Sequence, residues 1–246
     1  MADIDPSQSF VFADHLVLDE SPTRNFYKEL LQGLIHKNNN MLGVVQGFSS
    51  LILMDDDVSQ SVCDNVQQMK ESAHQSTELA RGILTTAGCA RVQIEDTDLN
   101  ALFPYFEQVT KSLCDEHGVG LQFNRPEGLP IIQADGNRLN EILRELTQNA
   151  AEAAGAMTPK GEVAIDVFPP GEAVEGNNVN IFIRNSSESI PAENIMKMFT
   201  PFEGTKGNDH EGNGLTTAAI LAGQMGIRLG LRNADGTTTV WLSIPA

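Results

Sequence analysis

The sequence predicts an α+β protein in which a two-helix hairpin is followed by an α/β sandwich, one sheet with helices on one face. Apolar residues recur at helical spacing over residues 21–54 and again over 58–87. From residue 91 onward, short strand-like patterns are mixed with helical ones, which indicates antiparallel strands with helices on one face of the sheet. We therefore divide the chain into an acidic N-terminal arm (1–20), a helical hairpin (21–90) and a sandwich domain (91–246). The alternation in SFVFADHLVLD indicates a short strand or a packing arm within the first segment.

Composition excludes several classes of protein. The 246 residues are 41% hydrophobic and 20% charged, which is enough for a sizeable core. A net charge of −17, with only 16 Lys and Arg, argues against a nucleic-acid partner. No run of about 18 apolar residues is present, so we expect no membrane partner. Three cysteines at unrelated spacings fit reduced thiols, and hence a cytoplasmic protein.

The hairpin carries an apolar seam on each helix. The seam residues of the first helix follow a strict 3-4-3-4 spacing, and the second helix has a seam of similarly spaced residues. These rows are Leu31, Leu34, Asn38, Met41, Val45, Phe48 and Ile52, and Val62, Val66, Met69, Ala73, Ser76, Ala80, Ile83 and Ala87. Two helices cannot enclose a core alone, so the pattern predicts a homodimer with a four-helix bundle.

One histidine of the hairpin lies off this seam. With the seam at heptad positions a and d, His36 falls at position f and faces solvent, and Asn40 follows one turn later. Three glycines share the outward stripe, namely Gly33, Gly43 and Gly47. Each costs about 1 kcal/mol relative to alanine inside a helix. A bare strip beside an exposed imidazole would let another protein approach it closely.

The sandwich domain alternates between strand and helix. Strands are predicted at 91–98, 120–124, 162–168, 178–184, 227–233 and 238–244, and helices at 99–117, 137–154 and 215–225. The strands 162–168 and 178–184 are expected to pair, and the last two flank the turn Ala234-Asp235-Gly236.

The segment LIHKNNNMLGVVQGF resembles the phospho-acceptor helix of two-component sensor histidine kinases. The resemblance implies that His36 attacks the γ-phosphate of ATP and passes the group to an aspartate of a response regulator receiver domain. It also implies that Asn40 positions water when the regulator is dephosphorylated. The family usually has Asp or Glu after the histidine, as a proton acceptor. This chain has Lys37 there.

Residues 91–246 resemble the ATP-binding domain of the same kinases, a fold shared with Hsp90, gyrase and MutL. The segment ILRELTQNAAEAA resembles the N-box, and the segment from 181 to 207 resembles the G1 turn and F-box. The resemblance implies ATP and Mg²⁺ as ligands, with Asn149 holding the metal. The other residues that it assigns to the nucleotide pocket are Glu145, Asn185, Lys206, Gly212 and Gly214.

Two departures fall on this pocket. In the G1 turn, the aspartate that accepts a hydrogen bond from adenine is Asn185, and Ser187 and Ser189 replace glycines. Losing the charge costs about 1–2 kcal/mol, roughly 5- to 30-fold in affinity. In the G2 loop, Thr216 stands in place of the third glycine, where its side chain would crowd the phosphates.

Three functions are compatible with these motifs. The first is a histidine phosphotransferase with a degenerate ATP domain, similar to ChpT, in which His36 exchanges phosphate with receiver aspartates. Its phosphate would come from an upstream hybrid histidine kinase, and the lack of a sensor domain before residue 21 favours it. The second is an autophosphorylating, ATP-dependent histidine kinase. The third is a catalytically silent scaffold that binds a response regulator. The sequence favours the first.

Overall fold

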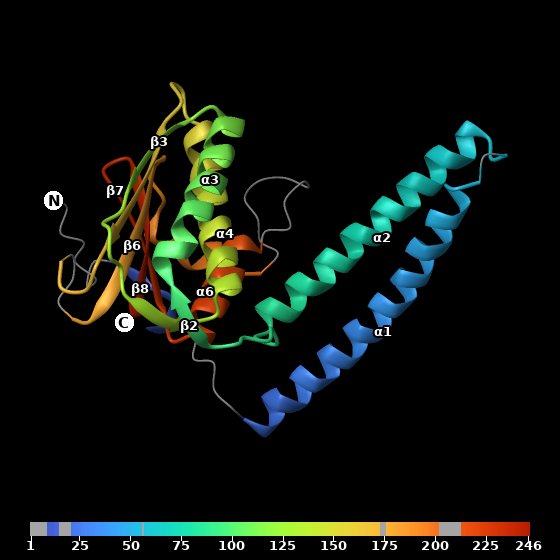
Figure 1. The fold of residues 1–246 in the computed structure, drawn as a ribbon, viewed down its shortest axis with the longest axis horizontal. Coiled ribbons are helices and arrows are strands. Elements are labelled where there is room, and N and C mark those ends of the chain that lie inside the picture. The colour runs from blue at the N-terminus through green and yellow to red at the C-terminus, as the bar shows by residue number, and fades with distance from the viewer. Residues whose placement is uncertain (1–8, 15–20, 56, 173–175, 202–212) are drawn as a thin grey trace. The chain divides into compact units, whose positions relative to one another are not determined.

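The computed structural model describes residues 9–14, 21–55, 57–172, 176–201 and 213–246. They form two compact units, one made of residues 21–90 and the other of residues 9–14 together with 91–246 (Figure 1). Within the described residues, no helix is both long and apolar enough to cross a bilayer.

The first unit is an antiparallel hairpin of two long helices, α1 (Pro22–Ile52) and α2 (Gln60–Thr86). Ser21 caps the start of α1 by accepting a hydrogen bond from the Arg24 amide at 3.2 Å, and proline occupies the first turn. After α2 the chain turns at Gly88, whose φ of 69° is costly for residues with a Cβ. Both helices therefore begin and end close to the positions that the sequence predicted.

The two helices bury only a narrow strip against each other. α1 buries Ile35 and Ser49, and α2 contributes four buried residues, Val66, Ala73, Ala80 and Thr85. The predicted seam of α1 remains largely open, because Leu34, Met41 and Phe48 are 57%, 64% and 64% exposed. Successive helical residues are about 100° apart, so the seam through Leu34 faces a different direction from Ile35. The hairpin thus has a second apolar face that its own described residues leave largely exposed.

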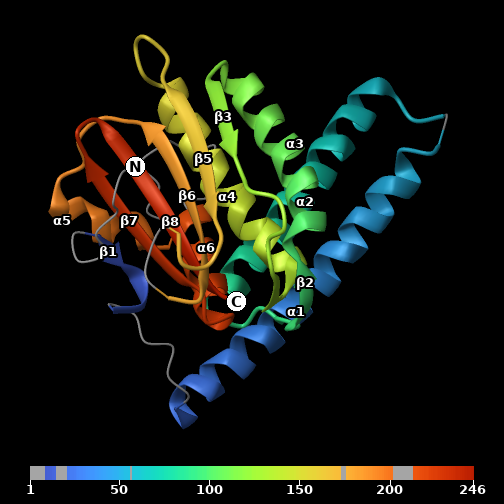
Figure 2. The same ribbon diagram turned by 60° about the vertical axis from the view of Figure 1, so that its left-hand side comes forward.

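The second unit is an α/β sandwich. Its six-stranded sheet has the order β1-β7-β8-β6-β5-β3, and its three long helices cover one face (Figure 2). The strands are β1 (Phe10–Val11), β3 (Gly120–Asn124), β5 (Glu162–Phe168), β6 (Asn178–Ser186), β7 (Arg228–Ala234) and β8 (Thr237–Pro245). The helices are α3 (Leu99–His117), α4 (Gly136–Gly155) and α6 (Gly214–Gln224). The predicted fold class is confirmed.

The helices and the sheet enclose a continuous apolar core. α3 and α4 each present a row of fully buried side chains to the sheet, including Phe103 and Leu143. The strands contribute buried residues such as Ile165 and Ile181 to this core, and the central strands β6 and β8 each bury five consecutive residues. This core fixes where α4 and α6 lie on the sheet.

Three local features differ from the sequence prediction. β3 pairs with β5 in parallel, whereas antiparallel strands were expected. β2 (Glu95–Asp98) and β4 (Ile131–Ala134) form a separate two-stranded sheet. β4 was not predicted, because its four residues are too few to show the alternation of apolar and polar residues that is typical of a strand. The stretch before residue 200 forms a short α5 (Ala192–Ile195) and the 3₁₀ helix η3 (Met196–Phe199).

The described part of the N-terminal arm belongs to the sheet unit. β1 pairs antiparallel with β7, with Phe10 opposite Leu231 and Val11 opposite Gly230. The 3₁₀ helix η2 (Phe12–Asp14) follows directly. The alternating pattern of this region predicts a short strand or packing arm, and in the structure it completes the edge of the sheet.

Candidate functional site

His36 lies in the middle of α1 and is exposed, and so is Asn40 one turn later. Because His36 is two residues from Leu34, the two side chains point about 160° apart around the helix axis. The imidazole therefore faces away from the open apolar seam. It also lies about 100° from Ile35, which packs against α2.

The glycine stripe beside His36 is unobstructed. A Cβ added at Gly33, Gly43 or Gly47 would meet no atom within 4 Å. None of these glycines is required by packing inside the hairpin, nor does any of them have a positive φ. Their effect is to keep the backbone of α1 bare along the stripe that carries the histidine.

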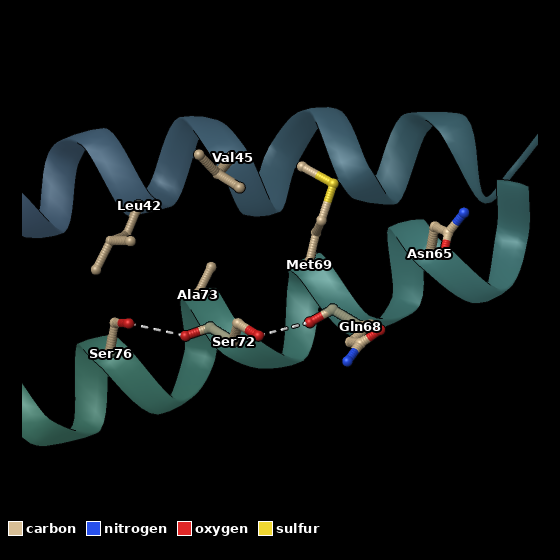
Figure 3. A pocket seen from close by; sticks show the side chains of 8 residues that line it. All are labelled: Leu42, Val45, Asn65, Gln68, Met69, Ser72, Ala73 and Ser76. Atoms are coloured by element: carbon tan, nitrogen blue, oxygen red, sulfur yellow. Dashed lines mark hydrogen bonds between the residues drawn. The ribbon is translucent and has the colours of Figure 1, made fainter.

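A groove of about 510 Å³ runs between the two helices on another side of the hairpin (Figure 3). Leu42 and Val45 line it from α1, and Met69 and Ala73 from α2 (Figure 3). Its other lining residues are polar: Asn65, Gln68, Ser72 and Ser76. Val45 and Met69 are also members of the predicted bundle seam, so the groove is continuous with the open apolar face.

In the sheet unit, Asp135 fixes the start of α4. Its Oδ1 accepts hydrogen bonds from the Asn137 and Arg138 amides, both at 3.1 Å, and its Oδ2 accepts one from the Gln93 amide at 2.9 Å. A capping carboxylate of this kind stabilises the first turn of a helix. It thereby sets the helical phase of Glu145 and Asn149, which lie one turn apart further along α4.

Glu145 and Asn149 lie against the beginning of α6. A Cβ on Gly214 would lie 2.7 Å from Glu145 Oε2 and 3.5 Å from Asn149 Nδ2, so any larger residue at this position would require the Glu145 carboxylate to shift. Glu145 Oε1 also forms an ion pair with Arg144 at 2.6 Å. The structure thus brings together three of the residues that the sequence assigned to a nucleotide pocket.

Thr216 does not point where the sequence predicted. Its side chain is buried, and its hydroxyl donates a hydrogen bond to the carbonyl oxygen of Phe199 at 2.9 Å. The hydroxyl therefore connects the first turn of α6 to the end of η3. The expectation that Thr216 crowds a phosphate site is not supported by this geometry.

The G1 segment is anchored by two residues that the sequence reasoning missed. Asn233 donates through Nδ2 to Thr238 Oγ1 at 2.9 Å and to Ser187 Oγ at 3.1 Å, and Ser187 and Thr238 hydroxyls lie 2.8 Å apart. Asn185 is buried and donates through Nδ2 to the Ser186 carbonyl at 2.9 Å. One sequence signal was available: Asn233 continues the inward-facing row of β7 after Leu229 and Leu231.

Two predicted site residues, Lys206 and Gly212, lie outside the described residues. His36 and Asn40 belong to one compact unit, and the residues assigned to the nucleotide pocket belong to the other. Among the described residues, no group of three or more His, Cys, Asp and Glu side chains could hold a metal ion. A cation in this domain would depend on the amide and carboxylate oxygens of Asn149 and Glu145.

The chain is similar to one family model and to several curated proteins. Residues 134–246 match the family model described as histidine kinase-, DNA gyrase B-, and HSP90-like ATPase. The chain is 25% identical over 220 residues to the sensor histidine kinase ZraS of Escherichia coli (strain K12), covering 87% of this chain and 45% of the relative. It is 23% identical over 233 residues to the hybrid signal transduction protein dokA of Dictyostelium discoideum, covering 88% and 14%.

Solved structures share the fold. ShkA, crystallised at full length in complex with AMPPNP, has a TM-score of 0.71 and 24% identity, covering 88% of this chain and 45% of that chain. ThkA in complex with the response regulator protein TrrA has a TM-score of 0.54 and 18% identity, covering 92% and 67%. The chain spans about half the length of the first curated relatives that it matches.

These comparisons correct the function that the sequence favoured. The matching curated proteins include sensor kinases and a hybrid signalling protein, and the family model is that of an ATPase, so the degenerate, ChpT-like phosphotransferase is not supported. The lack of a sensor domain before residue 21 carries no weight, because the chain covers only part of these relatives. Residues 134–246 have the ATPase fold that solved histidine kinases share.

Proposed function

We propose that this chain is the transmitter of a histidine kinase, which uses ATP to phosphorylate His36 and then hands the phosphoryl group to a receiver aspartate. The observation that carries the proposal is the close approach of Gly214 to Glu145 and Asn149. This approach brings the N-terminus of the 11-residue helix α6 next to the side chains of Glu145 and Asn149. A helix N-terminus favours anions, and carboxylate and amide oxygens are suitable ligands for a hard cation.

The residues present fit a Mg²⁺–ATP complex. Asn149 and Glu145 would supply oxygen ligands to the metal, and the first amides of α6, with Gly212 and Gly214, would face the phosphates. Lys206 would add a positive charge on the phosphate side. Asn185 has its Nδ2 engaged with Ser186, so its Oδ1 would accept from the adenine amino group. Bound Mg²⁺ would neutralise the charge that develops during phosphoryl transfer.

At His36 an imidazole nitrogen would attack the γ-phosphorus. A nitrogen–phosphorus bond forms, the bond between the γ-phosphorus and the bridging oxygen breaks, and ADP leaves with that electron pair. The imidazole must also lose its N–H proton, either to water or to a base. Because Lys37 cannot accept a proton while charged, we expect the wild-type chain to autophosphorylate slowly.

The hairpin would provide the dimer and the docking face. Two copies would pack through the exposed apolar seam and the groove beside it, and give a four-helix bundle. A receiver domain would approach the glycine stripe, and Asn40 would orient water for dephosphorylation of the regulator. The ThkA complex, in which a histidine kinase of this fold is bound to a response regulator protein, supports that type of partner.

Labelling with γ-phosphate-labelled ATP and Mg²⁺ tests the proposal. We expect acid-labile label on the wild-type chain, none on His36→Gln, and none on Asn149→Ala, which removes the amide oxygen that would hold the metal. Circular dichroism would check that both variants are folded. An unlabelled wild type at millimolar ATP would refute the kinase and leave the scaffold function.

The proton acceptor can be tested separately. Replacing Lys37 by Glu would place a carboxylate beside the imidazole, and a positioned base contributes about 10²-fold or more to such steps. We expect Lys37→Glu to raise the initial labelling rate by at least about tenfold, whereas Lys37→Gln should change it less. Equal rates in the two variants would exclude a missing base as the cause of slow labelling.

A further inference from the structure

The described part of the N-terminal arm contacts Phe199, which leads to the candidate nucleotide site. The arm adds β1 to the edge of the sheet by pairing with β7. Without it, β7 would present unpaired backbone groups along an open edge. The pairing fixes the register of Phe10 and Val11, so the side chains of these two residues point to opposite faces of the sheet.

Alternating residues of the arm face opposite sides of the sheet. Val11 packs against Phe182 and Trp241, on the face away from the helices. Phe10 stacks on Phe199, with ring centroids 5.1 Å apart and ring planes inclined by 27°. Phe12 meets the same ring at 5.3 Å. Phe199 is thus held between two aromatic side chains of the arm, and only 6% of it is exposed.

From Phe199 the contacts continue to the beginning of α6. The Phe199 carbonyl accepts the buried hydrogen bond from Thr216. Thr216 lies in the first turn of α6, two residues after Gly214. The side chains of Glu145 and Asn149 come closest to α6 beside Gly214, where a Cβ would lie within 4 Å of both. An unbroken series of contacts therefore connects the arm to the groups that we assign to Mg²⁺ and phosphate.

We propose that the arm is a positioning element of the nucleotide site, acting through Phe199 and Thr216 on the first turn of α6. The proposal rests on the proposed ATP-binding function and adds to it a dependence on residues that precede the phospho-acceptor helix. Aromatic packing of Phe10 and Phe12 restricts Phe199, and the Thr216 hydroxyl transmits that restriction to the helix start. The amides that would bind phosphate are then aligned before the nucleotide arrives, which reduces the ordering cost of binding.

The first test uses the full chain with Phe10→Leu and Phe12→Leu, singly and together. Leucine keeps apolar volume but removes ring stacking. The dissociation constant of the non-hydrolysable analogue AMPPNP with Mg²⁺ is measured by calorimetry. We expect the double variant to bind about 5- to 10-fold more weakly, with α6 amides that exchange hydrogen faster in the absence of nucleotide.

Phe168→Leu is the matched control. Phe168 packs on the same sheet but on the Val11 side, where its ring lies 5.5 Å from that of Phe182. The substitution is chemically identical and should lower the melting temperature, yet leave AMPPNP affinity and α6 exchange at wild-type values. If Phe168→Leu lowered AMPPNP affinity as much as the arm variants do, the arm would merely stabilise the whole sheet unit. That result would overturn the proposal.

Thr216 provides the second test. Thr216→Val removes the hydroxyl and keeps the shape, whereas Thr216→Ser keeps the hydroxyl. We expect Thr216→Val to weaken AMPPNP binding about as much as the arm variants do, and Thr216→Ser to bind AMPPNP as tightly as the wild type. If the arm acts through this bond, Thr216→Val combined with Phe12→Leu should be less than additive. Full additivity would mean that the two act independently, against the proposal.

Failure of the inference and of the proposed function can be told apart. If the wild type binds no AMPPNP, the kinase proposal fails, and faster α6 exchange in the arm variants still supports the mechanical link. If the wild type binds AMPPNP, and the arm variants bind it equally well with unchanged α6 exchange, the positioning role is wrong while the kinase proposal stands.

Discussion

The helical hairpin and the sheet unit bury their large apolar side chains to very different degrees. In the sheet unit, Phe103, Leu143 and Ile165 are completely buried between helices and strands. In the hairpin, Phe48 and Met41 are each 64% exposed, and the buried strip consists largely of small residues such as Ala73 and Ala80. The sheet unit therefore has a finished core, whereas the hairpin does not.

The difference shows which unit depends on a partner. A soluble chain seldom exposes a continuous apolar face unless another surface covers it. The open face runs along nearly the whole of α1 and continues onto α2 at Val62 and Met69. The stability of the hairpin should therefore depend on protein concentration, and that of the sheet unit should not.

The largest expected effect comes from charging the open face. Leu34→Glu combined with Met41→Glu would place two carboxylates in the proposed bundle core, where each costs several kcal/mol when unpaired. We expect a monomer at concentrations where the wild type is a dimer, measured by analytical ultracentrifugation. His36→Glu with Asn40→Glu adds the same charge on the outward stripe and should remain dimeric. If the wild type were itself a monomer, the hairpin would not need a second copy to cover its apolar face, and the proposed difference between the two units would be wrong.

Truncating a phenylalanine in each unit sharpens the comparison. Phe103→Ala should cost about 3–5 kcal/mol of unfolding free energy at any protein concentration. Phe48→Ala should cost less than about 1 kcal/mol in dilute monomer, and its main effect should be weaker dimerisation. Chemical denaturation at two concentrations separates the two. A concentration-independent loss of several kcal/mol at Phe48 would show that it is already buried within one chain.

Glycine-to-alanine substitutions should have opposite signs in the two units. A Cβ at Gly230 would overlap the indole of Trp241, so Gly230→Ala should destabilise by about 1–3 kcal/mol. Gly43 is open, so Gly43→Ala should stabilise α1 by up to about 1 kcal/mol. If the glycine stripe serves receiver docking, the same change should slow phosphotransfer to a receiver. Thermal unfolding and transfer rates, measured on both variants, check these signs.

The smallest effect concerns Cys114, which is buried in α3. Burial raises the pKa of its thiol from 9.0 to about 11, with a smaller contribution from the Asp115 charge. Because the folded pKa is raised, the protonated thiol contributes stability below about pH 9 that is lost between pH 9 and 11. Cys114→Ser should flatten the pH dependence of the unfolding free energy in that window. If the slope of unfolding free energy against pH were the same in Cys114→Ser as in the wild type, the Cys114 thiol would not be shielded from solvent.

The sequence predicted best those features that are local. The helix at 99–117 was predicted with the same bounds as α3, because Asp98 caps its start and Gly118 ends it with a φ of 65°. The Asp235-Gly236 turn was likewise visible, and both residues have positive φ. Local hydrogen bonds and backbone preferences determine such elements, so a window of sequence contains the necessary information.

Features that depend on distant partners could not be predicted in this way. The parallel pairing of β3 with β5 and the contact of the Thr216 hydroxyl with Phe199 require knowledge of the tertiary fold. In the candidate site, motif order predicted that Glu145, Asn149 and Gly214 belong together. It did not reveal that Asn233 and Thr238 anchor the G1 segment, because each appears in the sequence only as a polar residue in a strand.

The pairing of β1 with β7 has a consequence for how the protein is made. Phe10 is synthesised before both helices of the hairpin, and its partner Leu231 is synthesised after most of the sheet unit. This edge of the sheet therefore cannot close until β7 has been synthesised, and pairings between residues so far apart in sequence form slowly. Until β7 and β8 have been made, the apolar side chains of Phe10, Val11 and Phe12 have no native partners, and such transiently exposed residues favour aggregation.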